Sequence, residues 1–312
     1  MEDARASLRH FVSIDYNRSF AVAPGVQATF YDAGHILGSA LIAVDAEEDG
    51  RSYRLCFTGD LGRAGLPILR DPQTVRNVDC LIIESTYGNR LHGDVSEAQA
   101  ALRDVVRSTY DRGGKVIIPA FAVGRTQEIV YDLHDLIVSG RLPSLPVFVD
   151  SPLAINITET FRLHPECYDE EILDLLAQKE DPLGFYRLHY TRTVDESKAI
   201  NSLDEPCIII SASGMCEAGR ILHHLKNNIG DPQNTILFVS FQAGHTLGRK
   251  IRDGWETVPI LGDKHKVRAQ IASIDGYSAH ADRDELLNYV QQVKDDGRLK
   301  HVFIVHGNPE AC

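Results

Sequence analysis

KVIIPAFAVGRTQEIVYDLHDLIV, residues 115–138, joins a short apolar run to a loop of small residues and then to a segment with helical apolar spacing. A continuous apolar run is typical of a strand that is buried on both faces, and the 3.6-residue spacing is typical of an amphipathic helix. The same order of strand, loop and helix recurs at residues 146–161, 207–229 and 235–251. This alternation predicts a parallel α/β sheet with helices on both faces.

The flanking sequence has a different texture. Residues 26–34 and 40–60 carry aromatic and β-branched runs around an acidic, Gly-containing turn, which predicts β hairpins, and residues 78–86 predict one more short strand. Residues 96–114 have helical spacing and end at a Gly pair, as a helix does. After residue 268 the pattern returns to strand, helix and closing strand. We therefore expect a β-rich domain at 1–87, an inserted α/β domain at 88–268, and a return to the first domain at 269–312.

The composition is ordinary for a globular chain of 312 residues, with 43% hydrophobic and 24% charged residues. The net charge of −12 argues against broad, non-specific attraction to nucleic acid, although a local basic surface remains compatible with it. No apolar run approaches the ~20 residues that span a bilayer, and the first residues lack the apolar core of a signal peptide. Six scattered cysteines without a Cys-x-x-Cys pair favour reduced thiols. These features predict a cytoplasmic protein without a membrane partner.

Five apolar strand-like runs end in an ionisable or metal-binding side chain. Each of the five has an ordinary structural explanation by itself, as a turn, a cap or a solvated strand end. Their repetition is more informative, because loops at the ends of a sheet commonly hold catalytic groups. The five motifs are AGHILGSA with His35, FTGDLG with Asp60, ESTYGNR with Glu84, GYSAHAD with His280 and VHGNP with His306.

These motifs, in this order, resemble those of the metallo-β-lactamase superfamily, and more narrowly its β-CASP branch of RNA-processing nucleases. Four inserted motifs resemble the second domain of that branch: IPAFAVGRTQE, VDSPLA, SASGM and FQAGHTLGR. The resemblance covers nearly the whole chain. It implies an α/β protein in which a partial αββα metallo-β-lactamase sandwich carries an inserted parallel-sheet β-CASP domain.

The resemblance also implies roles for the five strand-end residues. His35, Asp60 and His306 would be metal ligands of a site for two Zn²⁺ ions, with Asp60 as the bridging carboxylate, and the ions with Asp60 would activate a water. His280 would protonate the leaving oxygen as a general acid, a role that suits an imidazole near neutral pH. Glu84 would orient His280 and favour its charged form.

The inserted domain offers candidate phosphate contacts at its strand-to-helix loops. Backbone N–H groups in such loops favour anions, so Ser211, Ser213 and Gly214 could cradle a phosphate, and Arg125 and Arg249 could add positive charge, with Arg220 and Lys250 as further cations. The alternative is that these loops are plain turns. The adjacent His223 and His224 are expected to be solvated surface residues rather than metal ligands.

The sequence does not contain the His-x-His-x-Asp-His signature of the superfamily. We therefore expect a piece of a longer nuclease whose zinc site is incomplete, with weak zinc binding and little activity by itself. The expected function is that of a zinc-dependent ribonuclease acting on single-stranded RNA, as an endonuclease, a 5′–3′ exonuclease or both. The alternatives are a non-catalytic RNA-binding or scaffold subunit and a DNA nuclease of the same branch. A homodimer stays open.

Overall fold

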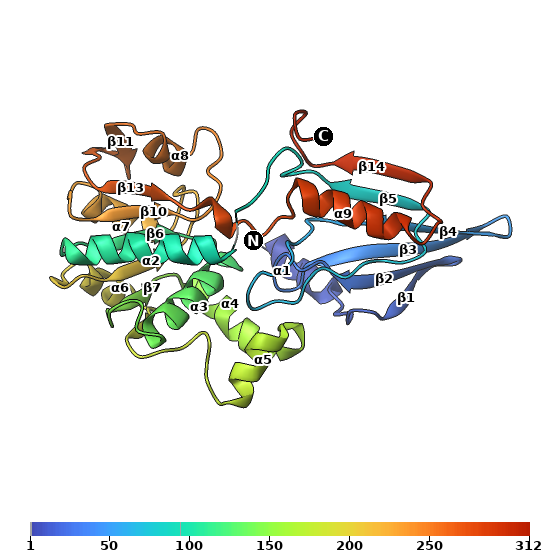
Figure 1. The fold of residues 1–312 in the computed structure, drawn as a ribbon, viewed down its shortest axis with the longest axis horizontal. Helices are drawn as coiled ribbons and strands as arrows, with labels where there is room; N and C mark the ends of the chain where they lie inside the picture. The colour runs from blue at the N-terminus through green and yellow to red at the C-terminus, as the bar shows by residue number, and fades with distance from the viewer. Residues whose placement is uncertain (1, 94) are drawn as a thin grey trace. The chain divides into compact units, whose positions relative to one another are not determined.

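The computed structural model describes residues 2–93 and 95–312, and the chain divides into two compact units (Figure 1). Unit 1 comprises the chain up to Ala64 with Asp71–Leu91 and His280–Cys312, and unit 2 comprises Gly65–Arg70 and His92–Ala279. The predicted domain limits at 87/88 and 268/269 lie four and eleven residues before the crossings at 91/92 and 279/280, and Gly65–Arg70 lies in unit 2 although the prediction put it in the first domain. The domain limits stay a prediction.

Unit 1 contains a six-stranded mixed sheet in the order β1-β2-β3-β4-β5-β14. The first four strands are antiparallel neighbours, and β4, β5 and β14 run parallel to one another. The helical segments of this unit are α1 (Glu2–Ser7), η1 (Leu8–His10) and α9 (Arg283–Lys294). The strands are β1 (Ser19–Ala23), β2 (Val26–Asp32), β3 (Ala40–Glu48), β4 (Arg51–Phe57), β5 (Cys80–Glu84) and β14 (His301–Val305).

One face of this sheet forms the core of unit 1. Leu41, Cys56 and Leu81, on three successive neighbouring strands, are fully buried, and Leu286 and Val293 of α9 belong to the same cluster. Because side chains alternate between the two faces of a strand, each of these strands directs its intervening residues to the opposite face.

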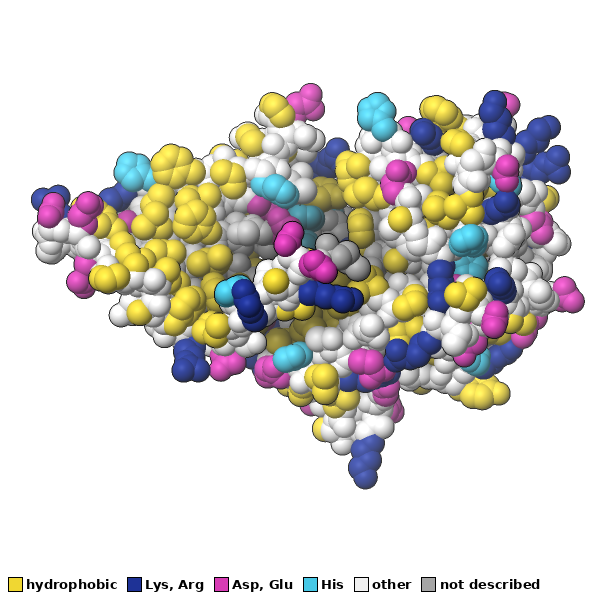
Figure 2. Space-filling model, turned by 180° about the vertical axis from the view of Figure 1, so that it is seen from behind, with side chains coloured by type: hydrophobic (Ala, Val, Ile, Leu, Met, Phe, Trp, Pro, Cys, Tyr) yellow, Lys and Arg dark blue, Asp and Glu magenta, His cyan; other side chains and the backbone are white. Residues whose placement is uncertain are grey.

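The opposite face of the sheet is apolar as well. The strand register places Ile42, Phe57, Ile82 and Phe303 in one row across β3, β4, β5 and β14. Phe57 is 39% exposed and Phe303 is 55% exposed. Figure 2 shows hydrophobic side chains gathered over this sheet. A sheet that is apolar on both faces is typical of a sandwich or layered fold.

Unit 2 contains a six-stranded, all-parallel sheet in the order β13-β10-β6-β9-β7-β8. The four strand–loop–helix repeats predicted from the sequence are present as β6–α3, β7–α4, β9–α7 and β10–α8. The strands are β6 (Val116–Pro119), β7 (Val147–Val149), β8 (Leu188–Tyr190), β9 (Ile208–Ser211), β10 (Thr235–Phe238) and β13 (Gln270–Ser273). The α-helices are α2 (Val95–Asp111), α3 (Arg125–Val138), α4 (Pro152–Leu163), α5 (Glu170–Ala177), α6 (Val194–Ile200), α7 (Ile221–Asn228) and α8 (Leu247–Arg252), and the 3-10 turns are η2 (Pro165–Cys167) and η3 (Asp275–Tyr277). The predicted α/β class, with one mixed sheet and one all-parallel sheet, is confirmed.

Unit 2 also carries a two-stranded antiparallel hairpin that was not predicted from the sequence. It consists of β11 (Thr257–Ile260) and β12 (Asp263–Lys266), joined by Leu261 and Gly262. Val258 and Ile260 are fully buried in the cluster that also contains Leu225 of α7 and Ile251 of α8. This burial fixes one face of the hairpin against unit 2. Among the described residues, no helix combines the length and the apolar character needed to cross a membrane.

Candidate functional site

Four strands of unit 1 end at the same edge of the sheet. Strand β3 is antiparallel to both β2 and β4, so β2 and β4 run in one direction, and β5 and β14 are parallel to β4. His35 and Asp60 each follow the end of a strand by three residues, Glu84 is the last residue of β5, and His306 directly follows β14. The topology therefore brings four of the five expected residues to one edge.

Tight turns hold His35 and Asp60 at this edge. The backbone N–H of Gly34 donates to Oδ1 of Asp32 over 2.9 Å, and the N–H of His35 donates to the Ser39 hydroxyl over 3.2 Å. Gly34 and Gly59, directly before the two residues, have φ angles of +62° and +55°. Glycine adopts such angles without the steric cost that other residues meet.

Glu84 is a buried carboxylate that several donors surround. Its Oε1 accepts hydrogen bonds from the Leu61 N–H over 2.7 Å and from Nδ1 of His280 over 3.0 Å, and its Oε2 accepts from the Thr86 N–H over 3.1 Å. Burial alone would raise the pKa of Glu84, but the hydrogen bond and charge of His280 and the other donors outweigh it, so that the pKa lies below its ordinary value. Glu84 is therefore held as an anion.

His280 reaches this edge from the segment that precedes α9. A β-bridge joins it to Gly62, and the N–H of Ala281 donates to the carbonyl of Leu61 over 2.8 Å. An added Cβ at Gly62 would lie 2.1 Å from the backbone of Gly34, so this close approach requires glycine. The imidazole of His280 then lies 4.4 Å, centroid to centroid, from that of His35.

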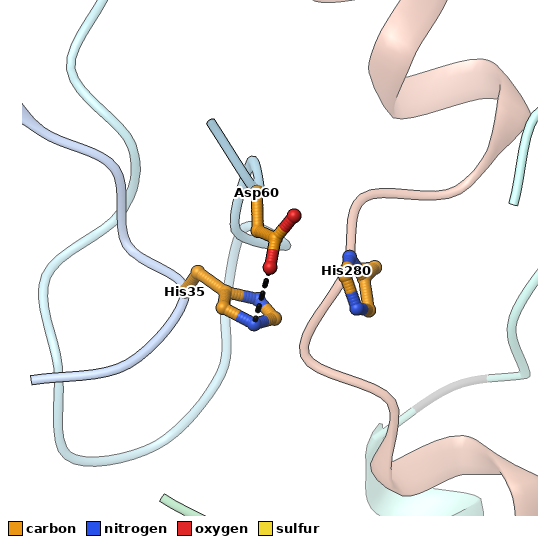
Figure 3. Close-up of side chains that lie close together, drawn as sticks. All are labelled: His35, Asp60 and His280. Atoms are coloured by element: carbon orange, nitrogen blue, oxygen red, sulfur yellow. Dashed lines mark ion pairs between the residues drawn. The ribbon is translucent and has the colours of Figure 1, made fainter. Parts of the chain in front are cut away.

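Asp60 lies between two groups of metal-binding atoms. Its Oδ2 is 3.9 Å from Nε2 of His35, and its Oδ1 is 3.7 Å from Nδ1 of His306. Ligand atoms of His35, Asp60 and His280 lie within 4.8 Å of one another, and so do those of Asp60, Glu84 and His306. Figure 3 shows His35, Asp60 and His280 pointing toward one another from three separate loops. Asp60 belongs to both groups, as a bridging ligand would.

The last of the five residues, His306, lies on a strained and closely packed turn. It has a φ of +67°, and an added Cβ on the following Gly307 would lie 2.1 Å from the hydroxyl of Ser85. Nδ1 of His306 is 3.3 Å from the hydroxyl oxygen of Thr86. The backbone therefore accepts an unfavourable angle in order to place this imidazole beside β5. Thr86 and Thr58 were not predicted as site residues. The hydroxyl of Thr58 accepts from the Glu84 N–H over 3.2 Å.

The donor set fits zinc in its chemistry. Imidazole nitrogen and carboxylate oxygen are ordinary zinc ligands, and the shared carboxylate suits two ions about 3.5–4 Å apart. Glu84 and His280 engage one another, so His35, Asp60 and His306 are the residues best placed to bind metal. Two zinc ions normally take three or four protein ligands each, which is more than these three supply.

The expected phosphate contacts of unit 2 occupy well-ordered loops. The buried Ser211 hydroxyl donates to the Asp150 carbonyl over 2.8 Å, and the Ser213 hydroxyl accepts from the N–H of Glu217 over 3.1 Å. The buried Gly214 packs against Phe121, where an added Cβ would approach the ring to 3.1 Å.

The two arginines of that set already form ion pairs within unit 2. The buried Arg125 pairs with Glu128 and lies over the ring of Tyr277, and Arg249 pairs with Asp253 over 2.8 Å. Their role in phosphate binding stays a prediction.

Asp150, at the end of β7, is the centre of a buried polar cluster that was not foreseen. Its carboxylate accepts from Ser197 over 2.5 Å, and from Arg220 and from Nε2 of His224 over 2.6 Å each. Burial would raise the pKa of Asp150, but the hydrogen bonds from His224, Ser197 and Arg220 outweigh it and lower the pKa. The expectation that both neighbouring histidines are solvated is therefore wrong for His224, which is fully buried, and right for the exposed His223.

The chain matches known protein families and known proteins in sequence. Residues 126–251 match the model of the Beta-Casp domain, and residues 264–312 match that of the Zn-dependent metallo-hydrolase RNA specificity domain. Ribonuclease TTHA0252 of Thermus thermophilus is 34% identical over 309 residues, which cover 99% of this chain and 69% of that protein. The chain belongs to the β-CASP metallo-β-lactamase family.

Other β-CASP relatives differ in length from this chain. Transcription termination factor FttA of Methanosarcina mazei is 34% identical over 319 residues, covering 98% of the chain and 49% of that factor. The RNase J-like protein of Methanocaldococcus jannaschii is 32% identical, with 98% of the chain and 69% of that protein covered. The chain thus spans about half the length of the FttA factors and about two thirds of the length of the other two relatives.

Proposed function

We propose that this chain supplies part of a zinc-dependent phosphodiesterase site that cleaves single-stranded RNA. The observation that supports this best is the convergence of His35, Asp60, Glu84, His280 and His306 on one edge of the unit 1 sheet, in two donor groups that share Asp60. The names of two relatives, a ribonuclease and an RNase J-like protein, favour RNA as the substrate.

His35, Asp60 and His306 would hold the zinc. Bound zinc would lower the pKa of a coordinated water and offset negative charge on the phosphoryl oxygens. Asp60 would contribute one carboxylate oxygen toward each side of the site, which its 3.9 Å and 3.7 Å distances to the two imidazoles allow.

His280 would act as the general acid. The oxygen of the water, which gives up one proton to solvent, would bond to phosphorus while the bond from phosphorus to the leaving oxygen breaks, and the leaving oxygen would take a proton from Nε2 of His280. Nδ1 is the nitrogen bound to Glu84, 3.0 Å away, so the carboxylate fixes the ring orientation and stabilises its positive charge. Since Glu84 also accepts backbone N–H groups from Leu61 and Thr86, the pair is held rigidly.

The test uses the longest natural polypeptide that contains these 312 residues, loaded with zinc, and labelled RNA and DNA strands of the same sequence. The variant His280→Ala is expected to lower kcat on RNA by about 10²–10⁴-fold, because a general acid contributes that much, with little change in RNA affinity. The control His223→Ala removes an exposed histidine of α7 and is expected to leave cleavage unchanged.

Three results would contradict this function. Cleavage that survives His280→Ala removes His280 from the reaction. RNA retention without cleavage at any zinc concentration identifies a binding subunit instead. Faster cleavage of the DNA strand identifies a DNA nuclease.

A further inference from the structure

The β11–β12 hairpin of unit 2 carries a row of positive charge on its solvent face. Within 249–268 the sequence has six Lys or Arg residues and three Asp or Glu residues, although the chain as a whole carries a net charge of −12. Lys264, Lys266 and Arg268 are all exposed. Figure 2 shows Lys and Arg side chains gathered over the part of unit 2 that carries this hairpin.

The strand register explains why these cations share one face. The register pairs Thr257 with Lys266 and Pro259 with Lys264, while the alternate pair, Val258 and His265, faces inward. Side chains two residues apart on a strand lie about 7 Å apart on the same face. The N–H of Val267 donates to the carbonyl of Glu256 over 2.9 Å, so the pairing continues past the end of β12.

An exposed aromatic ring lies at the end of this row. Trp255 lies two residues before β11 and is 51% exposed, and extending the register by one position beyond Glu256 and Val267 would pair it with Arg268. Nζ of Lys250 lies 5.6 Å from the Trp255 ring centroid, which adds a fourth positive charge there. We call Trp255, Lys264, Lys266 and Arg268 the hairpin strip.

The charges of the strip are not neutralised within the protein. Neighbouring cations have carboxylate partners: Lys226 pairs with Asp263 over 2.9 Å, and Arg252 pairs with Asp275 over 3.0 Å. Lys264, Lys266 and Arg268 form no such ion pair within residues 2–93 and 95–312. Three unpaired cations in a row beside an exposed indole suit a single strand of nucleic acid, which offers phosphates and stacking bases together.

We propose that the hairpin strip binds single-stranded RNA, with Lys264, Lys266 and Arg268 on three phosphates and Trp255 stacked on a base. The choice of RNA rests on the function proposed above. The strip is a binding surface built from residues outside the strand-end cluster of unit 1.

The test measures binding of a labelled 20-nucleotide uridine-rich RNA to the 312-residue chain in EDTA, by anisotropy. The variant K264A/K266A/R268A is expected to weaken binding about 10-fold at 150 mM salt and to lower the slope of log affinity against log salt by about 2, since each phosphate contact contributes about 0.7. The control R107A/K179A/K198A removes three exposed cations elsewhere in unit 2, with the same change in net charge, and is expected to change neither quantity.

Trp255 gives an independent readout, because it is the single tryptophan of the chain. RNA is expected to quench its fluorescence with the Kd that anisotropy reports, and Trp255→Ala is expected to weaken binding at least about 5-fold. Trp255→Phe, which keeps a ring for stacking, should retain most of the affinity.

The outcomes separate the strip from the proposed function. RNA binding by the strip would be contradicted if the triple variant kept the Kd and salt slope of the wild type, or if RNA did not quench Trp255. This would hold even if the longer polypeptide cleaves RNA. Quenching and the slope change in the 312-residue chain, together with no RNA cleavage by the zinc-loaded longer polypeptide, would support RNA binding by the strip and count against the proposed function. A chain that binds no RNA would overturn the strip.

Discussion

At the scale of the residue, Asp132 of α3 is a buried carboxylate whose ionisation opposes folding. It accepts from the Tyr277 hydroxyl over 2.5 Å and from Gln99 over 3.2 Å. Burial is the largest cause that raises the pKa of Asp132, from 3.8 to about 6, with the nearby charges of Glu128 and Asp135 adding to it. The folded state therefore holds this proton more tightly than the unfolded chain does. The protonated Asp132 therefore contributes fully to the stability of the folded state below about pH 4, and this contribution is lost as pH rises through about 6.

Asp132→Asn tests this dependence. A pKa difference of about two units corresponds to about 3 kcal/mol. The free energy of unfolding of the wild type should therefore fall by roughly that amount between pH 4 and 7 because of Asp132, and this contribution should be absent in Asp132→Asn. Urea unfolding at several pH values measures it, with the exposed Asp174→Asn of α5 as the control. Parallel pH curves for wild type and Asp132→Asn would contradict the assignment.

The strand-end positions of His35, Asp60, Glu84 and His306 could be predicted because each lies at the end of a strand-like run or within three residues of it. Their convergence follows from β2, β4, β5 and β14 running in one direction. The burial of His224 could not be predicted, because its partner Asp150 is 74 residues away in the sequence. Only the parallel sheet brings the end of β7 to α7, and no local pattern around His224 reports that contact.

At the scale of the element, Asp150 connects the end of β7 to two helices of unit 2. Its carboxylate accepts from Ser197 of α6, from Arg220 just before α7, and from His224 within α7. Asp150→Ala would leave the partly buried guanidinium of Arg220 and the buried imidazole of His224 without their anion. Removal of one partner from a buried charged cluster typically costs about 3–5 kcal/mol.

Chemical denaturation of the 312-residue chain measures this loss. Asp150→Asn keeps an acceptor oxygen and is expected to cost less than Asp150→Ala, and Ser197→Ala, which removes one hydrogen bond, about 1 kcal/mol. A loss below 1 kcal/mol for Asp150→Ala would show that the cluster does not hold the helices to the sheet.

The β11–β12 hairpin was overlooked because its turn lacks the usual signals. Leu261 and Gly262 have φ angles of +51° and +92°, which suits a two-residue hairpin turn, yet leucine rarely takes such an angle. The alternation of inward-facing and exposed residues in VPI and KHK is typical of paired strands, but it is short and adjoins the α/β repeats, which have a stronger pattern. The parallel sheet was easier to predict because each of its strands is a continuous apolar run.

At the scale of the whole molecule, the face of the unit 1 sheet opposite to α9 carries a row of partly exposed apolar side chains. The row formed by Ile42, Phe57, Ile82 and Phe303 crosses four strands, and β14 is exposed along its whole length. Contiguous apolar patches beyond a few hundred Å² mark interaction or layer-packing surfaces. The αββα sandwich that the resemblance to the metallo-β-lactamase superfamily implies would pack a second layer on this sheet.

The 312-residue chain by itself is therefore expected to bind a dye such as anilinonaphthalene sulfonate and to self-associate through this face. Phe57→Lys with Phe303→Lys should reduce both dye binding and self-association, and the cost in unfolding free energy should be small because both rings are already 39% and 55% exposed. Light scattering and denaturation measure the two effects. The control Phe241→Lys changes an exposed phenylalanine of unit 2 and should leave both dye binding and self-association unchanged.

In the longest natural polypeptide that contains the chain, the pair Phe57→Lys and Phe303→Lys should instead cost several kcal/mol of unfolding free energy, because a covering layer would bury both charges. A monomeric 312-residue chain without dye binding would show that this face is not adhesive, and a small cost in the longer polypeptide would show that nothing covers it.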